Sequence, residues 1–193
     1  MWTLNQARKN HTGPYEIEGT RGQRENAQWL RIRSWYCGGS VSQTITGLTK
    51  ESAKIAFLRK HVHRLDRDKI TPAMQTGIDN EGAARAKYTE IMQRSEPDLE
   101  VHETGSWGNP KYPALSCSPD ALVWSPVLGV WILLEIKILT LDHVNPKRFW
   151  ETMTKKQLGG FYLVKDSDGK IVVRMSHKYF RQIQHSLCVL EQG

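Results

Sequence analysis

The stretch Ser118-Pro-Asp-Ala-Leu-Val-Trp-Ser-Pro-Val-Leu-Gly-Val-Trp-Ile-Leu-Leu-Glu-Ile-Lys137 places three charged side chains at the ends of two apolar segments. Successive side chains of a strand point to opposite faces, so Glu135 and Lys137 share one face of a strand that begins at Val130. The residues from Ser125 to Val130 have the length and composition of a hairpin loop. We therefore expect two antiparallel strands that end in charged residues.

The register of this hairpin decides which charges meet. If Trp124 lies opposite Trp131, then Leu122 faces Leu133 and Asp120 faces Glu135, with β-carbons about 5 Å apart. Two carboxylates at that separation repel each other unless a cation lies between them, and a divalent metal commonly fills that role. The pattern predicts a cluster of Asp120, Glu135 and Lys137, and a salt-bridged, half-exposed strand is the alternative interpretation.

Composition limits the class of protein. The chain has 193 residues, of which 39% are hydrophobic and 24% are charged, which fits one globular domain. Its net charge of +7 favours a polyanionic partner such as nucleic acid, with an anionic membrane surface as the alternative. The three cysteines lack CxxC spacing and indicate reduced thiols. Without an apolar signal core or an 18-residue apolar run, we expect an intracellular protein, nuclear in a eukaryote and otherwise cytoplasmic.

Apolar periodicity predicts four longer helices. We expect them over residues 20–36, 49–65 and 71–94, and from a cap at Ser176 onward. The third has the clearest start, because Thr71 is a good N-cap and Pro72 suits the first helical position. Glu81 in this helix has two interpretations, an i,i+4 ion pair with Arg85 or a carboxylate that reaches the strand cluster.

The remaining segments predict strands and connections. We expect a loose arm over residues 1–19 before a single domain over residues 20–193, strands at 99–104 and just before Ser118, a loop near 105–110, a short helix near 146–156 and a hairpin over 161–173. The Gly38-Gly39-Ser40 segment predicts a flexible loop after the first helix. Arg33 beside such a loop could hold a phosphate, and a solvated arginine is the alternative.

Five separated motifs together resemble the YqaJ-type viral recombinases, the lambda exonuclease family of PD-(D/E)xK nucleases. The motifs are Trp29-x-x-x-Arg33 with Ser40, Gly77-x-x-x-Glu81-x-x-Ala84, Ser118-Pro-Asp120, Leu134-Glu-Ile-Lys137 and Tyr179-Phe-Arg-Gln182. They occur in the order of the family and cover roughly residues 25–190. The chain departs from the usual pattern at Ala121, where the family has Gly, and at Ile138-Leu139, where it has Cys-Pro. Neither departure removes an expected ligand, but both alter the strand ends.

The resemblance implies a restriction-endonuclease-like α/β fold with a central mixed β-sheet flanked by helices. It also implies Mg²⁺, with Mn²⁺ as a substitute, held by Glu81, Asp120, Glu135 and the backbone carbonyl of Ile136. Carboxylate and carbonyl oxygens are the ligands that Mg²⁺ prefers.

The same resemblance implies roles for further residues. Lys137 would orient or deprotonate the attacking water beside Asp120 and Glu135, and Gln182 would help to position it. Arg33 and Ser40 would bind the 5′-phosphate of a DNA end. The implied function is a metal-dependent 5′→3′ exonuclease that acts on duplex DNA ends in recombination or repair. A catalytically weak or inactive DNA-end-binding module, or an endonuclease of the same fold, is the alternative. Family analogy adds a homo-oligomer and a single-strand-annealing protein as partner.

Overall fold

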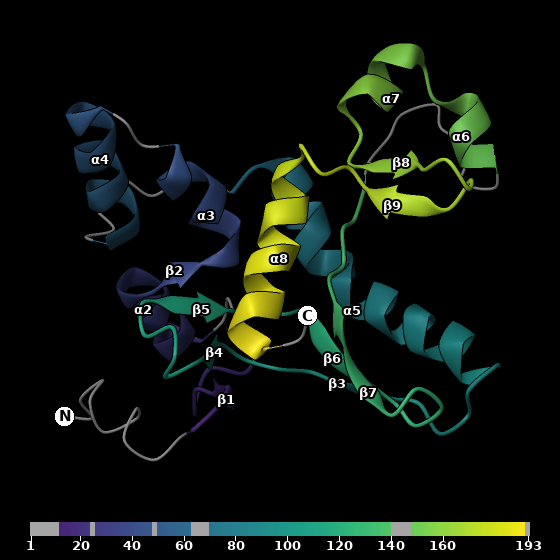
Figure 1. The fold of residues 1–193 in the computed structure, drawn as a ribbon, viewed down its shortest axis with the longest axis horizontal. Coiled ribbons are helices and arrows are strands. Elements are labelled where there is room, and N and C mark those ends of the chain that lie inside the picture. Colours follow the sequence, from purple (N-terminus) through teal and green to yellow (C-terminus); the bar gives the residue numbers. More distant parts are fainter. Residues whose placement is uncertain (1–11, 24–25, 48–49, 63–69, 140–147, 192–193) are drawn as a thin grey trace.

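The computed structural model describes residues 12–23, 26–47, 50–62, 70–139 and 148–191, and these form a mixed α/β fold with several small sheets (Figure 1). In chain order the elements are β1 (Tyr15–Glu16), α2 (Ala27–Trp35), β2 (Cys37–Gly38), α3 (Gly39–Thr46), α4 (Glu51–Phe57), a π-helical segment η2 (Leu58–Val62), α5 (Pro72–Gln93), β3 (Glu100–His102), β4 (Trp107–Gly108), β5 (Leu115–Cys117), β6 (Ala121–Ser125), β7 (Val130–Leu134), α6 (Phe149–Thr152), α7 (Lys155–Gly160), β8 (Leu163–Lys165), β9 (Ile171–Val173) and α8 (Lys178–Leu190).

The hairpin of β6 and β7 has the predicted register. Trp124 lies opposite Trp131 and Leu122 opposite Leu133, and Gly129 adopts the positive φ of +66° that the turn requires. The ladder ends at the pair of Ala121 and Leu134. The predicted strand to Lys137 is therefore too long, because the charged residues follow the last paired residue and lie at the open end of the hairpin.

The predicted single central sheet is not present in the residues that the structure describes. They form a four-stranded sheet in the order β1-β4-β5-β2, a three-stranded sheet in the order β3-β6-β7, and the β8-β9 hairpin. The four-stranded sheet is mixed, since β2 and β5 are parallel and its other pairs are antiparallel. The α/β class is thus confirmed, and the restriction-endonuclease-like core stays a prediction.

The chain passes from the three-stranded to the four-stranded sheet between β3 and β4. The buried Thr20 hydroxyl holds this crossing, because it donates to the Ile17 carbonyl at 2.5 Å and accepts from the Ser106 amide at 2.8 Å. Gly105 makes the approach feasible, since a β-carbon there would lie 2.2 Å from Thr20 Oγ1. These contacts fix the backbone where the chain passes from one sheet to the other.

The N-terminal segment differs from the predicted loose arm. Residues 1–11 lie outside the described residues, but β1 pairs with β4. Tyr15 and Ile17 are buried in a cluster with Ile32 and Tyr36 of the α2 region. This part of the segment is therefore built into the fold.

Several helices start elsewhere than predicted. The first begins at Ala27, where the Asn26 side chain accepts from the amides of residues 28 and 29. The predicted helix over residues 49–65 is α4 followed by η2, and Thr49 lies outside the described residues. The last is capped by His177 instead of Ser176. The start at Thr71-Pro72 is confirmed, with Thr71 Oγ1 accepting from the Met74 amide at 3.2 Å.

Two predicted loops contain regular structure. The predicted loop at 105–110 holds β4, and the predicted flexible loop at Gly39-Ser40 is the first turn of α3. Gly39 packs tightly on α8, since a β-carbon there would lie 3.2 Å from the Gln182 carbonyl oxygen. The predicted helix near 146–156 is interrupted, because Thr154 and Gln157 form a capping box that begins α7.

Helix α8 links the two larger sheets. Val189 and Leu190 share a core cluster with Cys117 of β5 and Leu122 of β6, and the His185 ring lies 2.9 Å from the Ser116 carbonyl. Figure 1 shows α8 in the centre of the molecule, with α6, α7, β8 and β9 extending beyond its N-terminal end. None of the described helices combines the length and apolarity that a membrane crossing requires.

Candidate active site

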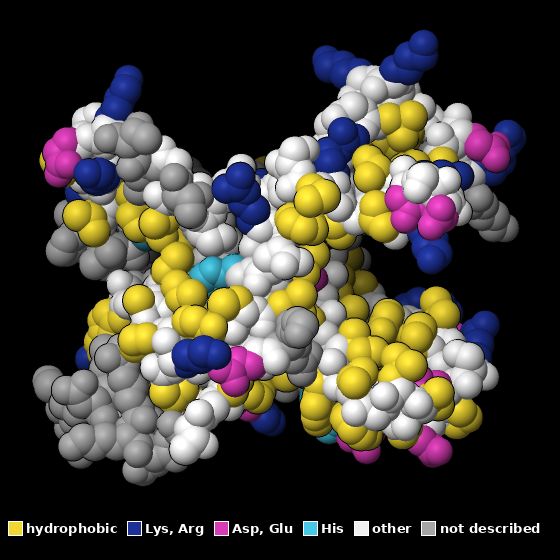
Figure 2. Space-filling model, in the orientation of Figure 1, with side chains coloured by type: hydrophobic (Ala, Val, Ile, Leu, Met, Phe, Trp, Pro, Cys, Tyr) yellow, Lys and Arg dark blue, Asp and Glu magenta, His cyan; other side chains and the backbone are white. Residues whose placement is uncertain are grey.

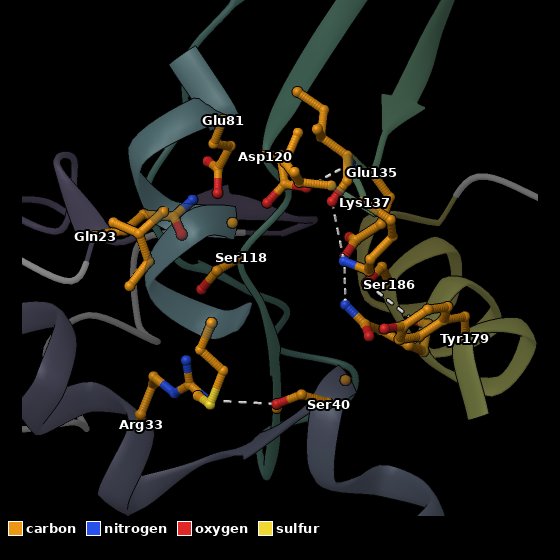
Figure 3. Close-up of a pocket in the computed structure, with 18 of the residues that line it drawn as sticks. Gln23, Arg33, Ser40, Glu81, Ser118, Asp120, Glu135, Lys137, Tyr179 and Ser186 are labelled. Atoms are coloured by element: carbon orange, nitrogen blue, oxygen red, sulfur yellow. Dashed lines mark hydrogen bonds and ion pairs between the residues drawn. The ribbon is translucent and has the colours of Figure 1, made fainter. Parts of the chain in front are cut away.

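A cavity of about 440 Å³ lies where α2, α3, α5, α8 and the open end of the β6-β7 hairpin converge. This cavity is lined by all the residues that were predicted from the sequence to form a site, namely Arg33, Ser40, Glu81, Asp120, Glu135, Ile136, Lys137 and Gln182. Figure 3 shows most of them around one open space. Residues up to 149 positions apart in the sequence are therefore brought together by the fold.

One wall of the cavity is formed by Asp120, Glu135, Lys137 and Gln182, which we call the carboxylate side. The Ile136 amide donates to Asp120 Oδ2 at 2.5 Å. Lys137 Nζ donates to Glu135 Oε1 and, at 3.2 Å, to the Ile136 carbonyl. Gln182 Nε2 donates to the same Glu135 oxygen at 2.6 Å. These bonds connect the end of the hairpin to α8 and fix the orientation of both carboxylates.

The carboxylate side is largely withdrawn from solvent, since the side chains of Glu135 and Lys137 are 11% and 24% exposed. Burial raises the pKa of Glu135 and the charge of Asp120 raises it further, whereas Lys137 and Gln182 act in the opposite direction. Burial by itself would lower the pKa of Lys137, but the attraction of Glu135 and Asp120 outweighs it and raises that pKa. The salt bridge of the alternative interpretation is thus present between Glu135 and Lys137, but it lies in the wall of a cavity and its side chains are less exposed than that interpretation expects.

Helix α5 brings a third carboxylate to the cavity. In Figure 3 the Glu81 side chain points toward the space that also faces Asp120. Arg85, one turn further, donates to the Asp120 carbonyl at 3.1 Å and forms an ion pair with Glu103 at 3.2 Å. Arg85 thus connects α5 to the hairpin. The sequence had indicated Arg85 only as an i,i+4 partner of Glu81.

The opposite wall is formed by Arg33, Ser40 and Trp29, which we call the phosphate side. The Arg33 guanidinium lies 4.4 Å from the centre of the Trp29 ring and donates to Ser40 Oγ at 3.3 Å. Trp29 is buried, and its indole N–H donates to Ser118 Oγ at 3.0 Å. Ser40 lies in the first turn of α3, where backbone N–H groups lack intrahelical acceptors. Guanidinium, hydroxyl and helix N-terminus are all groups that donate to anionic oxygens.

A family model for the YqaJ-like viral recombinase domain matches residues 28–192 of the chain. The chain belongs to the YqaJ family. The match includes both walls of the cavity and confirms the resemblance drawn from the five motifs. YqaJ membership implies a nuclease of the lambda exonuclease type, a role in recombination and a DNA substrate. No match was found among curated proteins or among solved structures.

The YqaJ family also suggests a divalent metal. Within the described ranges, no group of three or more His, Cys, Asp or Glu side chains is already arranged as a metal site. The donors nevertheless fit a hard cation, because Glu81, Asp120, Glu135 and the Ile136 carbonyl supply only oxygens. The electrostatics also favour positive charge here, since the charge of Asp120 contributes to the raised pKa of Glu135.

Some residues that line the cavity were not predicted from the sequence. Ser118 and Tyr179 line the cavity, and their signal was their place inside the Ser-Pro-Asp and Tyr-x-x-Gln motifs. Gln23 also lines it and donates to the Pro119 carbonyl at 2.9 Å, although no motif points to it. Two positions depart from the usual sequence pattern of the family. At these positions, Ala121 is fully buried opposite Leu134, and Ile138 lines the cavity.

Proposed function

We propose that this chain is a Mg²⁺-dependent deoxyribonuclease that hydrolyses duplex DNA from its 5′ ends during recombination or repair. One observation carries the proposal: the expected catalytic residues and the expected phosphate-binding residues line the same cavity. Family membership supplies the substrate class, and the arrangement of the two walls supports end-directed cleavage. Mn²⁺ has similar ligand preferences and is expected to replace Mg²⁺.

The carboxylate side suits phosphodiester hydrolysis. A divalent metal held by Glu81, Asp120, Glu135 and the Ile136 carbonyl would lower the pKa of a bound water and neutralise phosphate charge. The hydrogen bonds from the Ile136 amide and Gln182 keep Asp120 and Glu135 oriented before substrate arrives. Lys137 carries the positive charge that would orient the water and stabilise negative charge on the departing oxygen.

The phosphate side suits recognition of a DNA end. A terminal 5′-phosphate carries more negative charge than an internal phosphodiester, so a cationic guanidinium with a neighbouring hydroxyl favours it. Stacking on Trp29 holds the Arg33 guanidinium without using any of its N–H donors. A terminal phosphate bound by Arg33 and Ser40 would bring a phosphodiester of the same strand toward the carboxylate side, and cleavage would start at the 5′ end.

One observation favours an inactive DNA-end-binding module as the second candidate. Lys137 Nζ contacts Glu135 Oε1 and the Ile136 carbonyl, which are two of the expected metal donors. A lysine that remained in this position would neutralise the carboxylates without a metal, and the phosphate side would still bind an end.

Digestion of linear duplex DNA in Mg²⁺ or EDTA separates these candidates. The substrates carry 5′-phosphate or 5′-hydroxyl ends, and a covalently closed circle tests for endonuclease activity. We expect metal-dependent shortening of the phosphorylated linear duplex, lost in Glu135→Ala and Lys137→Ala proteins. The exposed ion pair of Lys87 and Glu90 on α5 provides matched controls. Glu90→Ala and Lys87→Ala remove the same charges at positions that do not line the cavity.

The other results each point to a different function. End binding without cleavage that these substitutions abolish would replace the nuclease by the end-binding module. Cutting of the closed circle would replace the exonuclease by an endonuclease of the same family.

A further inference from the structure

Two parts of the sequence are rich in positive charge, residues 1–69, with thirteen Lys and Arg residues against six Asp and Glu residues, and a segment near the C-terminus. The second part is residues 148–181, which we call the basic lobe and which contain eight Lys and Arg residues against three Asp and Glu residues, whereas residues 70–147 between the two parts contain six against ten. The basic lobe consists of α6, α7, β8, β9 and the first turn of α8. It extends from the centre of the molecule in Figure 1, and Figure 2 shows Lys and Arg side chains projecting from it. Neither wall of the cavity uses these charges.

Three lysines of the basic lobe present their charge to solvent. Lys155, Lys156 and Lys170 are exposed, and their ammonium groups form no ion pair with another of the described residues. Lys87 and Arg94 on α5, in contrast, both form ion pairs with Glu90. An exposed lysine whose ammonium group forms no ion pair is available to a polyanion.

The positions of Lys155 and Lys156 do not serve the stability of α7. They are its first two residues, where positive charge opposes the helix dipole. The start of α7 is secured by the Thr154 hydroxyl and the Gln157 side chain in a capping box. Replacing the two lysines by neutral residues is therefore expected to leave α7 folded.

The basic lobe is packed directly beside the carboxylate side. The ring centre of Tyr162 lies 5.1 Å from that of Tyr179 in an edge-on contact, and Lys137 Nζ lies 5.1 Å from the centre of the Tyr179 ring. Arg174 fixes α7 within the lobe, because it donates to the carbonyls of Leu158 at 2.9 Å and Phe161 at 3.0 Å. A duplex whose end lies in the cavity would therefore extend past a neighbouring cationic surface.

We propose that the basic lobe binds the phosphate backbone of duplex DNA at positions internal to the bound end, through Lys155, Lys156 and Lys170. The inference rests on the proposed function for its substrate and adds a second contact to it. Duplex DNA carries one negative charge per about 1.7 Å of its axis, so a long duplex presents phosphates to the lobe whatever its end chemistry. The contact is thus sensitive to duplex length and salt, and insensitive to the 5′ group.

Equilibrium binding in EDTA, where no cleavage is expected, tests this contact. Labelled duplexes of about 10 and about 30 base pairs, with 5′-phosphate or 5′-hydroxyl ends, are titrated with the full chain and a Lys155→Ala/Lys156→Ala/Lys170→Ala variant. We expect the variant to lose about tenfold or more in affinity for the long duplex. The slope of log K against log salt should become shallower by about 2 to 3, or close to one per phosphate contact. The preference for 5′-phosphate should not change.

A matched control removes the same number of charges elsewhere. The Lys54→Ala/Lys87→Ala/Arg94→Ala variant loses three exposed cations that have acidic partners, and its salt slope should change much less. A Lys155→Gln/Lys156→Gln/Lys170→Gln variant keeps the long polar side chains and should reproduce the alanine result if charge is responsible. Circular dichroism of each variant confirms that it is folded.

The inference fails if the lobe variants bind the long duplex with the same affinity and salt slope as the control variant. The inference also fails if the lobe variants lose the same affinity for the short duplex as for the long duplex and also lose the preference for a 5′-phosphate. The substitutions in the lobe would then have affected binding at the phosphate side. Cleavage by wild-type chain without lobe-dependent binding overturns this inference alone. Lobe-dependent binding by a chain that never cleaves overturns the proposed function alone.

Discussion

The two walls of the cavity hold their charges in different ways. On the carboxylate side, Glu135 is largely shielded from solvent and receives hydrogen bonds from Lys137 and Gln182, so negative and positive groups compensate each other within the protein. On the phosphate side, Arg33 rests on the Trp29 ring and donates to a serine hydroxyl. In the proposed function the first wall serves hydrolysis and the second binds an anion from outside. We therefore expect substitutions on the carboxylate side to lower the cleavage rate, and substitutions on the phosphate side to lower the preference for a 5′-phosphate end.

The largest effect is expected from Lys137→Met, which removes the cation of the carboxylate side. Loss of a group that orients water and stabilises charge commonly lowers the rate by about 10²–10⁴-fold. We expect a fall of this size in single-turnover cleavage at saturating phosphorylated duplex, with little change in end binding. Lys87→Met is the surface control. A variant that cleaves at the wild-type rate would remove Lys137 from the mechanism.

The next effect is expected on the phosphate side, from Arg33→Ala. A hydrogen bond to a charged group contributes about 1.5–3 kcal/mol, so the variant should lose about 10- to 100-fold in its preference for 5′-phosphate over 5′-hydroxyl ends. Competition binding of the two duplexes in EDTA measures this ratio. The matched control is Arg31→Ala on the same helix, because Arg31 also lies over a tryptophan ring, that of Trp35, at 4.8 Å but does not line the cavity. An unchanged ratio in the Arg33 variant would contradict the assignment.

A smaller effect is expected where the two walls meet, from Gly39→Ala. The new β-carbon would lie 3.2 Å from the Gln182 carbonyl oxygen, and overpacking of this kind costs about 1–3 kcal/mol. That cost exceeds the gain of about 0.5–1 kcal/mol that alanine offers within a helix. Urea denaturation should show a lower free energy of unfolding, and cleavage and end preference should weaken together. Gly82→Ala on α5, where no atom lies within 4 Å of the added carbon, should not destabilise the chain.

The smallest effect concerns Cys117, which lies behind the carboxylate side. Burial, together with the charge of Glu135, raises the pKa of its thiol to about 12. Because the raised pKa keeps the thiol protonated, only about one molecule in 10⁴ carries the thiolate at pH 8. Iodoacetamide at pH 8, followed by peptide mass spectrometry, should modify the exposed Cys188 and spare Cys117 until urea unfolds the chain. Rapid modification of Cys117 in the folded chain would show that this side is open to solvent.

The hairpin and α5 could be predicted from sequence because their signals are local. Alternation around Trp124 and Trp131 fixes the register of β6 and β7, and Thr71-Pro72 marks a helix start through its own capping chemistry. The site residues followed from motif order, which records which distant residues act together. Local chemistry and motif order thus indicated both walls of the cavity.

The sheets and α3 could not be predicted because their causes are distant in sequence. Strands β1, β2 and β4 have two residues each, too few to show a period. The segment between β3 and β4 is held by a hydrogen bond from the Ser106 amide to Thr20, 86 positions away in the sequence. Gly38-Gly39 indicates flexibility by composition, yet packing against Gln182, 143 positions away from Gly39, makes this segment the start of α3. Tertiary contact decides the structure of such segments.

The position of the carboxylates at the open end of a hairpin also bears on the order of assembly. Asp120, Glu135 and Lys137 lie within 18 residues, and hairpins of this size form in about 1–10 μs, before distant segments meet. Lys137 belongs to the same hairpin as Asp120 and Glu135. When the hairpin forms, the two carboxylates are therefore expected to approach each other with a neutralising cation already beside them. Glu81, Gln182 and Arg33 reach the cavity only through contacts of longer sequence separation, so we expect the charges of the hairpin to meet before the rest of the proposed site is assembled.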